Sequence, residues 1–213
     1  MSKNRVAIID YGCGNLYSLK KALVRVGAKP SIASRPEDIN SADILFLPGV
    51  GAFGKGMTEL RRRGFVEPLK ACISKGVSLF GICLGMQFLF ENSEEFGMYR
   101  GLGLLQGDVT KLIPQDAECK VPHVGWNTFW PLSEASNWDN TILKGLSGGE
   151  QAYFTHSYAA QSVESSSVVA LTEYGGARFA SVIAQGTVFG TQFHPEKSGE
   201  IGLQILKNFL EFV

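Results

Sequence analysis

The sequence predicts an α/β protein in which a mostly parallel sheet is flanked by helices and extended by antiparallel strands. In the first half of the chain, short apolar runs alternate with helical stretches, an order typical of parallel strands joined by helices. In the second half, short β-like runs are separated by Gly, Ser and Asn, which favours antiparallel strands. With 213 residues, 45% of them hydrophobic and 19% charged, we expect one domain over residues 1–213.

The first half is expected to contain two helical stretches between its strands. Asn15 can cap the first helix and Gly27 can end it, because many helices close on a residue in the left-handed conformation. The second stretch, Phe53–Lys75, should break near Gly64. Pro48-Gly49 should halt the strand before it. The strands are expected at Val6–Ile9, Ser31–Ala33, Ile44–Leu47 and Val77–Ile82.

The second half is expected to end in a helix that Ser198 caps. The apolar residues of this helix fall on one face, at Leu203, Leu206, Leu210 and Val213, with Ile205 and Phe209 alongside. The strand-like runs before it are Leu104–Ile113, Val121–Trp130, Ala152–Tyr158, Val168–Glu173, Arg178–Ala184 and Val188–Phe193.

Charge and cysteine content exclude several classes of function. Lys+Arg and Asp+Glu both number 20, so the sequence carries no basic footprint for nucleic acid or an anionic membrane. Four cysteines without a C-x-x-C pair, and only three histidines, do not predict a metal site. No apolar run is long enough for a transmembrane helix, and the N-terminal MSKNRVAIIDYG is a poor signal peptide. We therefore expect a cytoplasmic protein without metal or cofactor.

Cys83 lies in LFGICLGMQFLF, where a buried strand passes directly into a helix. Gly81 and Gly85 flank it, two residues away on each side. This is the pattern of a nucleophile elbow, G-x-S-x-G with sulfur in place of oxygen, in which a tight turn raises the nucleophile above the sheet. A helix N-terminus also favours the thiolate. The alternative is a small packing residue, since free cysteine is among the most buried residue types.

A thiol nucleophile needs a base, and the chain offers three histidines, at positions 123, 156 and 194. The first two have no acid close by in the sequence. His194 is followed by Pro195 and Glu196. Pro195 favours an extended chain, in which residues two apart point the same way, so Glu196 can reach the imidazole and hold its tautomer. We therefore predict Cys83, His194 and Glu196 as the catalytic residues.

An acyl-transfer site also needs hydrogen-bond donors for an oxyanion. The backbone N–H of Leu84, directly after the nucleophile, can supply one. The loop Gly49-Val50-Gly51 can supply another, although an ordinary strand-to-helix turn explains its glycines equally well. Gln87, one turn into the helix after Cys83, is a polar residue on an apolar segment, so we predict that it contacts substrate.

The motifs GICLGMQ (81–87) and FHPE (193–196) resemble those of the class I, or triad, glutamine amidotransferases. The resemblance implies a flavodoxin-like sheet, the fold of that class, carrying a triad of Cys83, His194 and Glu196. Cys83 would attack the side-chain amide of glutamine, form a glutamyl thioester and release ammonia. His194 would protonate the departing amine and then activate water.

Within this class, further motifs resemble the family of glutaminase subunits of imidazole glycerol phosphate synthase, in histidine biosynthesis: IIDYGCGNLYS, LPGVGAFGKGM, GICLGMQFLFENSEE, KVPHVGWN, YFTHSY and FHPEKSGEIGLQIL. The resemblance implies that Gln87 and Glu95 hold the α-amino group of glutamine. It also implies that the backbone of Gly49–Gly51 and of Ser157-Tyr158 lines the glutamine pocket. A surface facing a synthase partner is implied at Trp126, Tyr153, Lys197 and Ser198.

A partner is expected because the catalytic residues and the last helix leave no segment of this chain to aminate an acceptor. Ammonia in neutral water is mostly protonated and no longer nucleophilic, so a sheltered path to a second chain is expected. The resemblance identifies that chain as a (β/α)8-barrel cyclase, which makes imidazole glycerol phosphate and an aminoimidazole carboxamide ribotide. We also expect the oxyanion donor at Gly49-Val50-Gly51 to be turned away until the partner binds its ligand.

Other interpretations stay open at this point. A cysteine peptidase or hydrolase acting alone would share the elbow and the base, but Gln87, the Glu94-Glu95 pair and Lys197-Ser198 favour the amidotransferase. A binding module with a buried, unreactive Cys83 is a second alternative. Another amidotransferase of the class, with a different synthase partner, is a third.

Overall fold

The computed structural model describes residues 5–133, 137–161 and 163–213. Its helices are α1 (Leu16–Arg25), α2 (Phe53–Arg62), α3 (Val66–Ser74), α4 (Leu84–Gln87) and α5 (Gly199–Phe212), with 3-10 turns at Pro36–Ile39, Ser165–Ser167 and Pro195–Lys197. Its strands are β1 (Val6–Ile9), β2 (Ser31–Ala33), β3 (Ile44–Gly49), β4 (Ser78–Cys83), β5 (Asn92–Ser93), β6 (Tyr99–Arg100), β7 (Asp108–Lys111), β8 (His123–Pro131), β9 (Glu150–His156), β10 (Tyr158–Ala160), β11 (Val168–Tyr174), β12 (Ala177–Gln185) and β13 (Val188–Thr191). Across these described ranges, no helix is both long and apolar enough to cross a membrane.

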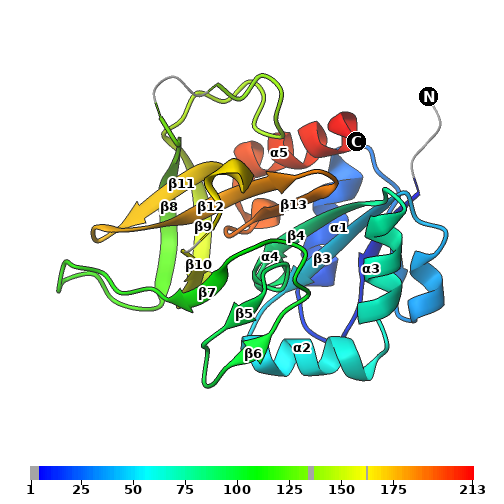
Figure 1. Ribbon diagram of the computed structural model, residues 1–213. Helices are drawn as coiled ribbons and strands as arrows, with labels where there is room; N and C mark the ends of the chain where they lie inside the picture. Colours follow the sequence, from blue (N-terminus) through cyan, green and yellow to red (C-terminus); the bar gives the residue numbers. More distant parts are fainter. Residues whose placement is uncertain (1–4, 134–136, 162) are drawn as a thin grey trace.

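In the described part of the chain, nine strands form one sheet, in the order β2-β1-β3-β4-β13-β12-β11-β8-β9 (Figure 1). The pairs from β2 to β13 are parallel, and the pairs from β13 to β9 are antiparallel. This confirms the predicted parallel sheet with antiparallel extensions. Because β13 runs parallel to β4, with Thr191 opposite Ile82, both strands end at the same edge. Cys83 and His194 are therefore brought together although they are far apart in the sequence.

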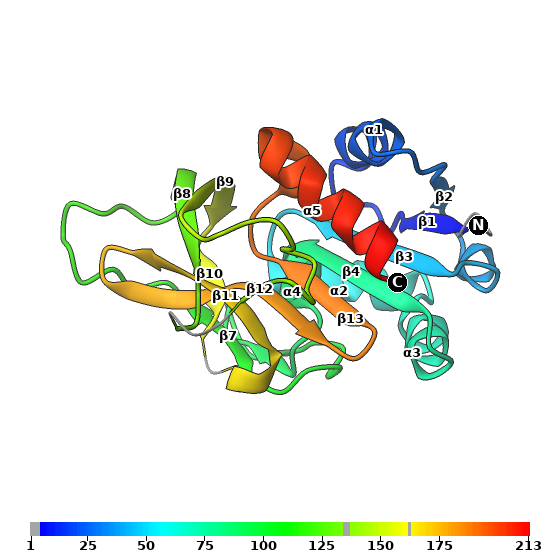
Figure 2. The same cartoon turned by 90° about the horizontal axis from the view of Figure 1, so that it is seen from above.

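Helices cover both faces of the parallel half of the sheet (Figure 2). On one face, α1 and α5 close a core that includes Leu23, Phe46, Phe80, Phe189 and Phe209. On the other face, α2, α3 and α4 close a second core that includes Met57, Leu69, Leu79, Met86 and Phe88. The break expected near Gly64 separates α2 from α3, and Gly64 has a φ of 76° there. Asn15 caps α1 as predicted, since its side chain accepts a hydrogen bond from the Ser18 N–H.

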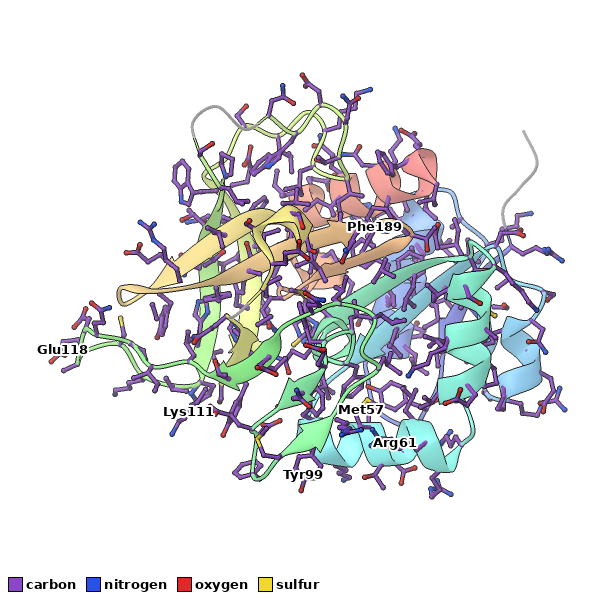
Figure 3. The ribbon with its side chains drawn as sticks, in the orientation of Figure 1. Met57, Arg61, Tyr99, Lys111, Glu118 and Phe189 are labelled. Atoms are coloured by element: carbon purple, nitrogen blue, oxygen red, sulfur yellow. The ribbon has the colours of Figure 1, made fainter. Side chains whose placement is uncertain are left out.

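A second sheet, in the order β10-β7-β5-β6, was not expected from the sequence. β5 and β6 have two residues each, too few to show a periodic pattern. β6 docks on α2, where the Tyr99 ring lies against Gly54 and the Arg61 guanidinium donates to the Arg100 carbonyl (Figure 3). This sheet therefore attaches the segment after Cys83 to the helix that follows β3.

Most strand boundaries differ from the prediction by one or two residues, the strand expected at Ala152–Tyr158 is divided into β9 and β10, and two further differences have a clear physical cause. Pro48-Gly49 does not halt β3, because the pairing with β4 continues to Gly49 opposite Cys83. On the other side of β3, the pairing with β1 ends at Ile8 opposite Phe46, so no N–H of residue 48 is needed there. The strand expected at Leu104–Ile113 shortens to β7, because the N–H groups of Leu104 and Leu105 donate instead to the Leu89 carbonyl.

Helix α5 begins at Gly199 and packs directly on the segment that carries His194. Ser198 occupies the predicted cap position, but its hydroxyl makes no capping bond and donates to the His194 carbonyl instead, at 2.7 Å. A Cβ on Gly202 would lie 1.9 Å from the Pro195 carbonyl oxygen. Only glycine therefore allows the helix to approach this closely.

We predict that Gly202→Ala destabilises the fold. Gly→Ala inside a helix ordinarily stabilises by roughly 1 kcal/mol, but here the Pro195 carbonyl has no room for the methyl group. The free energy of unfolding in urea should fall by about 2 kcal/mol or more. Glu211→Ala, at an exposed site of the same helix, is the control and should change it by no more than about 0.5 kcal/mol. An increase in stability for Gly202→Ala would contradict the close packing of α5.

Candidate active site

Cys83 is the last residue of β4, and its backbone turns sharply into α4. It has a φ of 53° and a ψ of −109°, a conformation that is costly for a residue with a side chain. The flanking glycines are required by contact: a Cβ on Gly81 would lie 2.7 Å from the Gly85 carbonyl oxygen, and one on Gly85 would lie 1.7 Å from the Leu47 carbonyl oxygen. These contacts fit the nucleophile elbow predicted from the Gly-x-Cys-x-Gly motif.

His194 and Glu196 form a buried pair beside the elbow. Nδ1 of His194 donates to Oε1 of Glu196 at 2.8 Å, and the two side chains are 2% and 4% exposed. Nε2 of His194 has no hydrogen-bond partner among the described residues, so it is free to exchange a proton with a reacting group. The structure thus brings together Cys83, His194 and Glu196 with the orientation of a base held by an acid.

The charge of His194 is set by two opposing effects. Burial lowers the pKa of His194, but the neighbouring Cys83 and Glu196 side chains raise it by more than burial lowers it. The resulting pKa is about 10. The imidazole therefore stays protonated at neutral pH, beside the Cys83 side chain. A thiolate–imidazolium pair is the reactive form of a cysteine nucleophile.

Two further groups contact the Cys83 sulfur. Gln192 donates from Nε2 to Sγ at 3.7 Å, and the Thr155 carbonyl oxygen lies 3.8 Å from Sγ. Gln192 is fully buried and was not singled out from the sequence. Its position two residues before His194 on an extended chain was the available signal, because such residues share one face.

A cavity of about 250 Å³ opens in front of Cys83. Most of the predicted oxyanion and substrate-binding residues line it, while Gly49 is buried behind it; the lining residues are Val50, Gly51, Cys83, Leu84, Gln87, Glu95, Thr155, His156, Ser157 and Tyr158. The volume of the cavity is large enough to hold a small amino acid, and Cys83 is part of its lining. The structure thus collects residues from the loop after β3, from β4 and α4, from the segment after β5, and from β9 and β10 around one site.

Gln87 and Glu95 are held in place by the protein. The Gln87 amide donates to the Tyr158 carbonyl at 2.8 Å and to Oε1 of Gln192 at 3.1 Å, which leaves its own oxygen as an acceptor. Oε2 of Glu95 accepts from the Phe53 N–H at 2.6 Å, at the start of α2. Burial raises the pKa of Glu95, and the Phe53 N–H lowers it in part. A cation beside the free oxygens of both side chains would satisfy them.

The Gly49 carbonyl faces the predicted oxyanion donor. At the start of the β3–β4 pair, the Ser78 N–H donates to the Asp43 carbonyl. Along a parallel pair of strands, the strand that donates alternates from one hydrogen bond to the next. The register that places Gly49 opposite Cys83 consequently directs the Gly49 carbonyl toward the Leu84 N–H. The adjacent Val50 N–H, in contrast, makes no hydrogen bond with the described residues.

The other two histidines form a hydrogen-bonded chain behind the cavity. Nδ1 of His156 lies 2.9 Å from the Tyr158 carbonyl, which can only accept, so His156 must present Nε2 as an acceptor to Nδ1–H of His123 at 3.2 Å. The Asn127 amide lies 3.4 Å from Nε2 of His123. Both imidazoles are therefore neutral and committed to this chain, which excludes them as the base for Cys83.

The surface expected to face a partner is only partly as predicted. Trp126 is 54% exposed, its ring meets Tyr153 edge-on at 6.2 Å, and the Lys197 ammonium lies 5.7 Å from the Tyr153 ring centre. Ser198, in contrast, is 2% exposed. Its hydroxyl accepts from the Tyr153 N–H at 3.0 Å, so it supports the surface from below instead of contributing to it.

The comparisons with known proteins agree with this geometry. The chain matches the family of class I glutamine amidotransferases over residues 7–212. A crystal structure of a glutamine amidotransferase has a TM-score of 0.74 at 20% identity and covers 97% of both chains. The PurLQS structure from Thermotoga maritima also has a TM-score of 0.74 at 20% identity, covering 99% of both chains. The chain therefore belongs to the class I glutamine amidotransferases and has their fold.

Similarity to individual relatives places the chain in one family within this class. The imidazole glycerol phosphate synthase subunit HisH 1 of Legionella pneumophila (strain Lens) is 43% identical over 97% of this chain and 98% of its own. The HisH subunit of Moorella thermoacetica is 46% identical over 98% of this chain and 95% of its own. Within the class, the chain thus belongs to the family of HisH subunits of imidazole glycerol phosphate synthase.

We predict that the three histidines titrate far apart. By NMR, His194 should lose its proton near pH 10, whereas burial holds the pKa of His123 at about 4 and that of His156 at about 3. Glu196→Gln should lower the His194 midpoint by roughly one unit or more, because it removes the carboxyl group whose hydrogen bond and charge raise the pKa of the ring. A His194 midpoint near 6.5 in the unmodified chain would contradict the charged pair.

The two neutral histidines should also make the fold acid-sensitive. Their pKa values, held by burial at about 4 and about 3, lie below the 6.5 of an unfolded histidine, so the unfolded chain binds more protons as the pH falls. The free energy of unfolding in urea should drop by about 4 kcal/mol between pH 6.5 and 4.5, about 2 kcal/mol for each histidine. His194 does not contribute in this window; its stabilisation is complete below pH 6.5 and is lost toward pH 10.

The control for this pH dependence is His156→Asn, which keeps a donor near the Tyr158 carbonyl but does not titrate. It should show about half of the acid loss. An unchanged acid loss in this variant would assign the effect to other groups.

Proposed function

We propose that this chain is the glutaminase subunit of imidazole glycerol phosphate synthase, and that it hydrolyses glutamine to glutamate and ammonia. The observation that carries the proposal is the buried Cys83–His194–Glu196 arrangement at the mouth of a cavity sized for an amino acid. The family to which the chain belongs supports the same reaction. Each catalytic role below is part of this proposal.

In the first half of the reaction, the Cys83 thiolate attacks the carbonyl carbon of the glutamine side-chain amide. The carbonyl oxygen becomes an oxyanion, which backbone N–H groups of Leu84 and Val50 receive. The tetrahedral intermediate collapses when the carbon–nitrogen bond breaks and the His194 imidazolium donates its proton to the departing nitrogen. Ammonia leaves, and a glutamyl thioester remains on Cys83.

In the second half, His194 is neutral and acts as the base. It takes a proton from water while the water oxygen attacks the thioester carbon, and the carbon–sulfur bond then breaks. Glutamate leaves, and the thiolate–imidazolium pair is restored. Glu196 supports both halves because its carboxylate holds Nδ1–H of His194 at 2.8 Å and stabilises the charged ring.

Substrate recognition follows from the free acceptors in the cavity. The α-ammonium group of glutamine suits the Gln87 carbonyl oxygen and the carboxylate of Glu95, which burial leaves in need of a cation. The backbone of Ser157 and Tyr158 forms the opposite wall. Its geometry is fixed because the Tyr158 carbonyl accepts from both Gln87 and His156.

Ammonia must then reach a second chain before water protonates it. We infer that the partner is a (β/α)8-barrel cyclase that docks on the exposed Trp126 ring, the half-buried Tyr153 ring and Lys197. The cyclase would use ammonia to form imidazole glycerol phosphate and aminoimidazole carboxamide ribotide in histidine biosynthesis. A cytoplasmic setting is proposed because the nucleophile needs a free thiol, and all four cysteines are free.

The direct test measures glutamate release from glutamine by the chain alone and with a cyclase subunit carrying its nucleotide ligand. The loaded partner should raise the rate, and Cys83→Ala should lower the stimulated rate by at least roughly 1000-fold, because no other group can form the thioester. Cys119→Ala, at a cysteine remote from the cavity, is the matched control and should keep full activity. Turnover of a peptide or ester, with none of glutamine, would instead support a hydrolase that acts alone.

A further inference from the structure

Tyr11 carries a buried hydroxyl that the catalytic roles above do not use. The residue lies two positions after the end of β1 and is 0% exposed, and its hydroxyl has no hydrogen-bond partner among the described residues. Its ring packs edge-on against Phe88, with centroids 5.9 Å apart. Phenylalanine would make the same ring contact without a buried polar group. Packing explains the ring, therefore, but not the hydroxyl, whose burial without a partner destabilises the fold.

The hydroxyl lies against the loop that must supply the oxyanion donor. Its oxygen is 2.5 Å from the place that a Cβ on Gly49 would occupy. Gly49 itself is buried. Burial, together with the nearby Cys13 and Cys83, raises the pKa of Tyr11 well above its usual range, so the phenol keeps its proton and remains a donor. Tyr11 is consequently a ready donor beside the Gly49–Val50 peptide.

That peptide has to turn before an oxyanion can bind. The register directs the Gly49 carbonyl toward the Leu84 N–H, the group that an oxyanion on the Cys83 adduct would need. In a trans peptide, C=O and the following N–H point in opposite directions. Rotation that removes the Gly49 carbonyl from Leu84 therefore turns the unpaired Val50 N–H toward the cavity. The same rotation turns the carbonyl into the protein, where it needs a new donor.

We propose that the Tyr11 hydroxyl receives the Gly49 carbonyl when the Gly49–Val50 peptide turns, so that Tyr11 is a positioning residue for the oxyanion hole. The inference rests on the proposed glutaminase function. It accounts for a buried hydroxyl that has no hydrogen-bond partner before the peptide turns, because the hydroxyl donates to the Gly49 carbonyl after the turn. It also explains why a tyrosine, and not a phenylalanine, follows β1 beside this loop.

The test is Tyr11→Phe in the full chain, which deletes one oxygen and keeps the ring. In the free chain, the melting temperature should be unchanged or higher, because an unpaired buried hydroxyl has been removed. With a ligand-loaded cyclase subunit, kcat for glutamine should fall roughly tenfold while KM stays within about twofold, because the loss concerns the transition state. Tyr17→Phe, which removes an exposed hydroxyl on α1, is the matched control and should change neither quantity.

Three outcomes would overturn the inference. An unchanged kcat in Tyr11→Phe would show that the hydroxyl plays no part in the oxyanion hole. A clearly lower melting temperature of the free chain would show that the hydroxyl is already bonded at rest. If the unmodified chain with its loaded partner releases no glutamate, the proposed function itself is wrong and the inference fails with it. The absence of activity in the unmodified chain distinguishes this failure from the other two.

Discussion

The backbone turn at Cys83 is the constraint on which the rest of the site depends. A residue with a side chain is held at a φ of 53° because β4 is locked between β3 and β13 while α4 must start at once. The turn closes only because Gly81 and Gly85 leave room for backbone carbonyls. With the turn closed, the Leu84 N–H lies against the Gly49 carbonyl, and the neighbouring strands β3 and β13 bring the Gly49 loop and the His194 segment to either side of Cys83.

Electrostatics then assign different tasks to chemically identical side chains. His194 is buried, but the Cys83 and Glu196 side chains beside it raise its pKa and keep it charged, and Gln192 donates to the Cys83 sulfur. His123 and His156 are also buried but face donors and acceptors that suit neutral rings, and burial lowers the pKa of both. The charged histidine is the proposed base, whereas His156 of the neutral pair is hydrogen-bonded to the Tyr158 carbonyl at the wall of the cavity.

The sequence contained the signals for the predicted nucleophile and base, because Gly-x-Cys-x-Gly and His-Pro-Glu are local patterns whose geometry follows from a few neighbouring residues. Parallel strands joined by helices followed from the alternation of apolar runs with helical stretches, and the gap at Gly64 from its backbone freedom. Features set by distant contacts could not be predicted. The two-residue strands β5 and β6 are too short to show a periodic pattern. The hydroxyl of Ser198 is hydrogen-bonded to the backbone of Tyr153 and His194, and the Tyr11 hydroxyl lies beside Gly49 only in the folded chain.

We propose that Cys83, among four free cysteines, is activated by the His194–Glu196 pair inside a glutamine pocket. To test this, the chain with its loaded partner present is treated with a chloroketone analogue of glutamine, and the modified peptides are mapped by mass spectrometry. We expect alkylation at Cys83 alone, slowed by added glutamine and strongly reduced in His194→Ala, which removes the imidazolium. Labelling of Cys13 or Cys119 with Cys83 untouched, or labelling of Cys83 that glutamine does not slow, would contradict it.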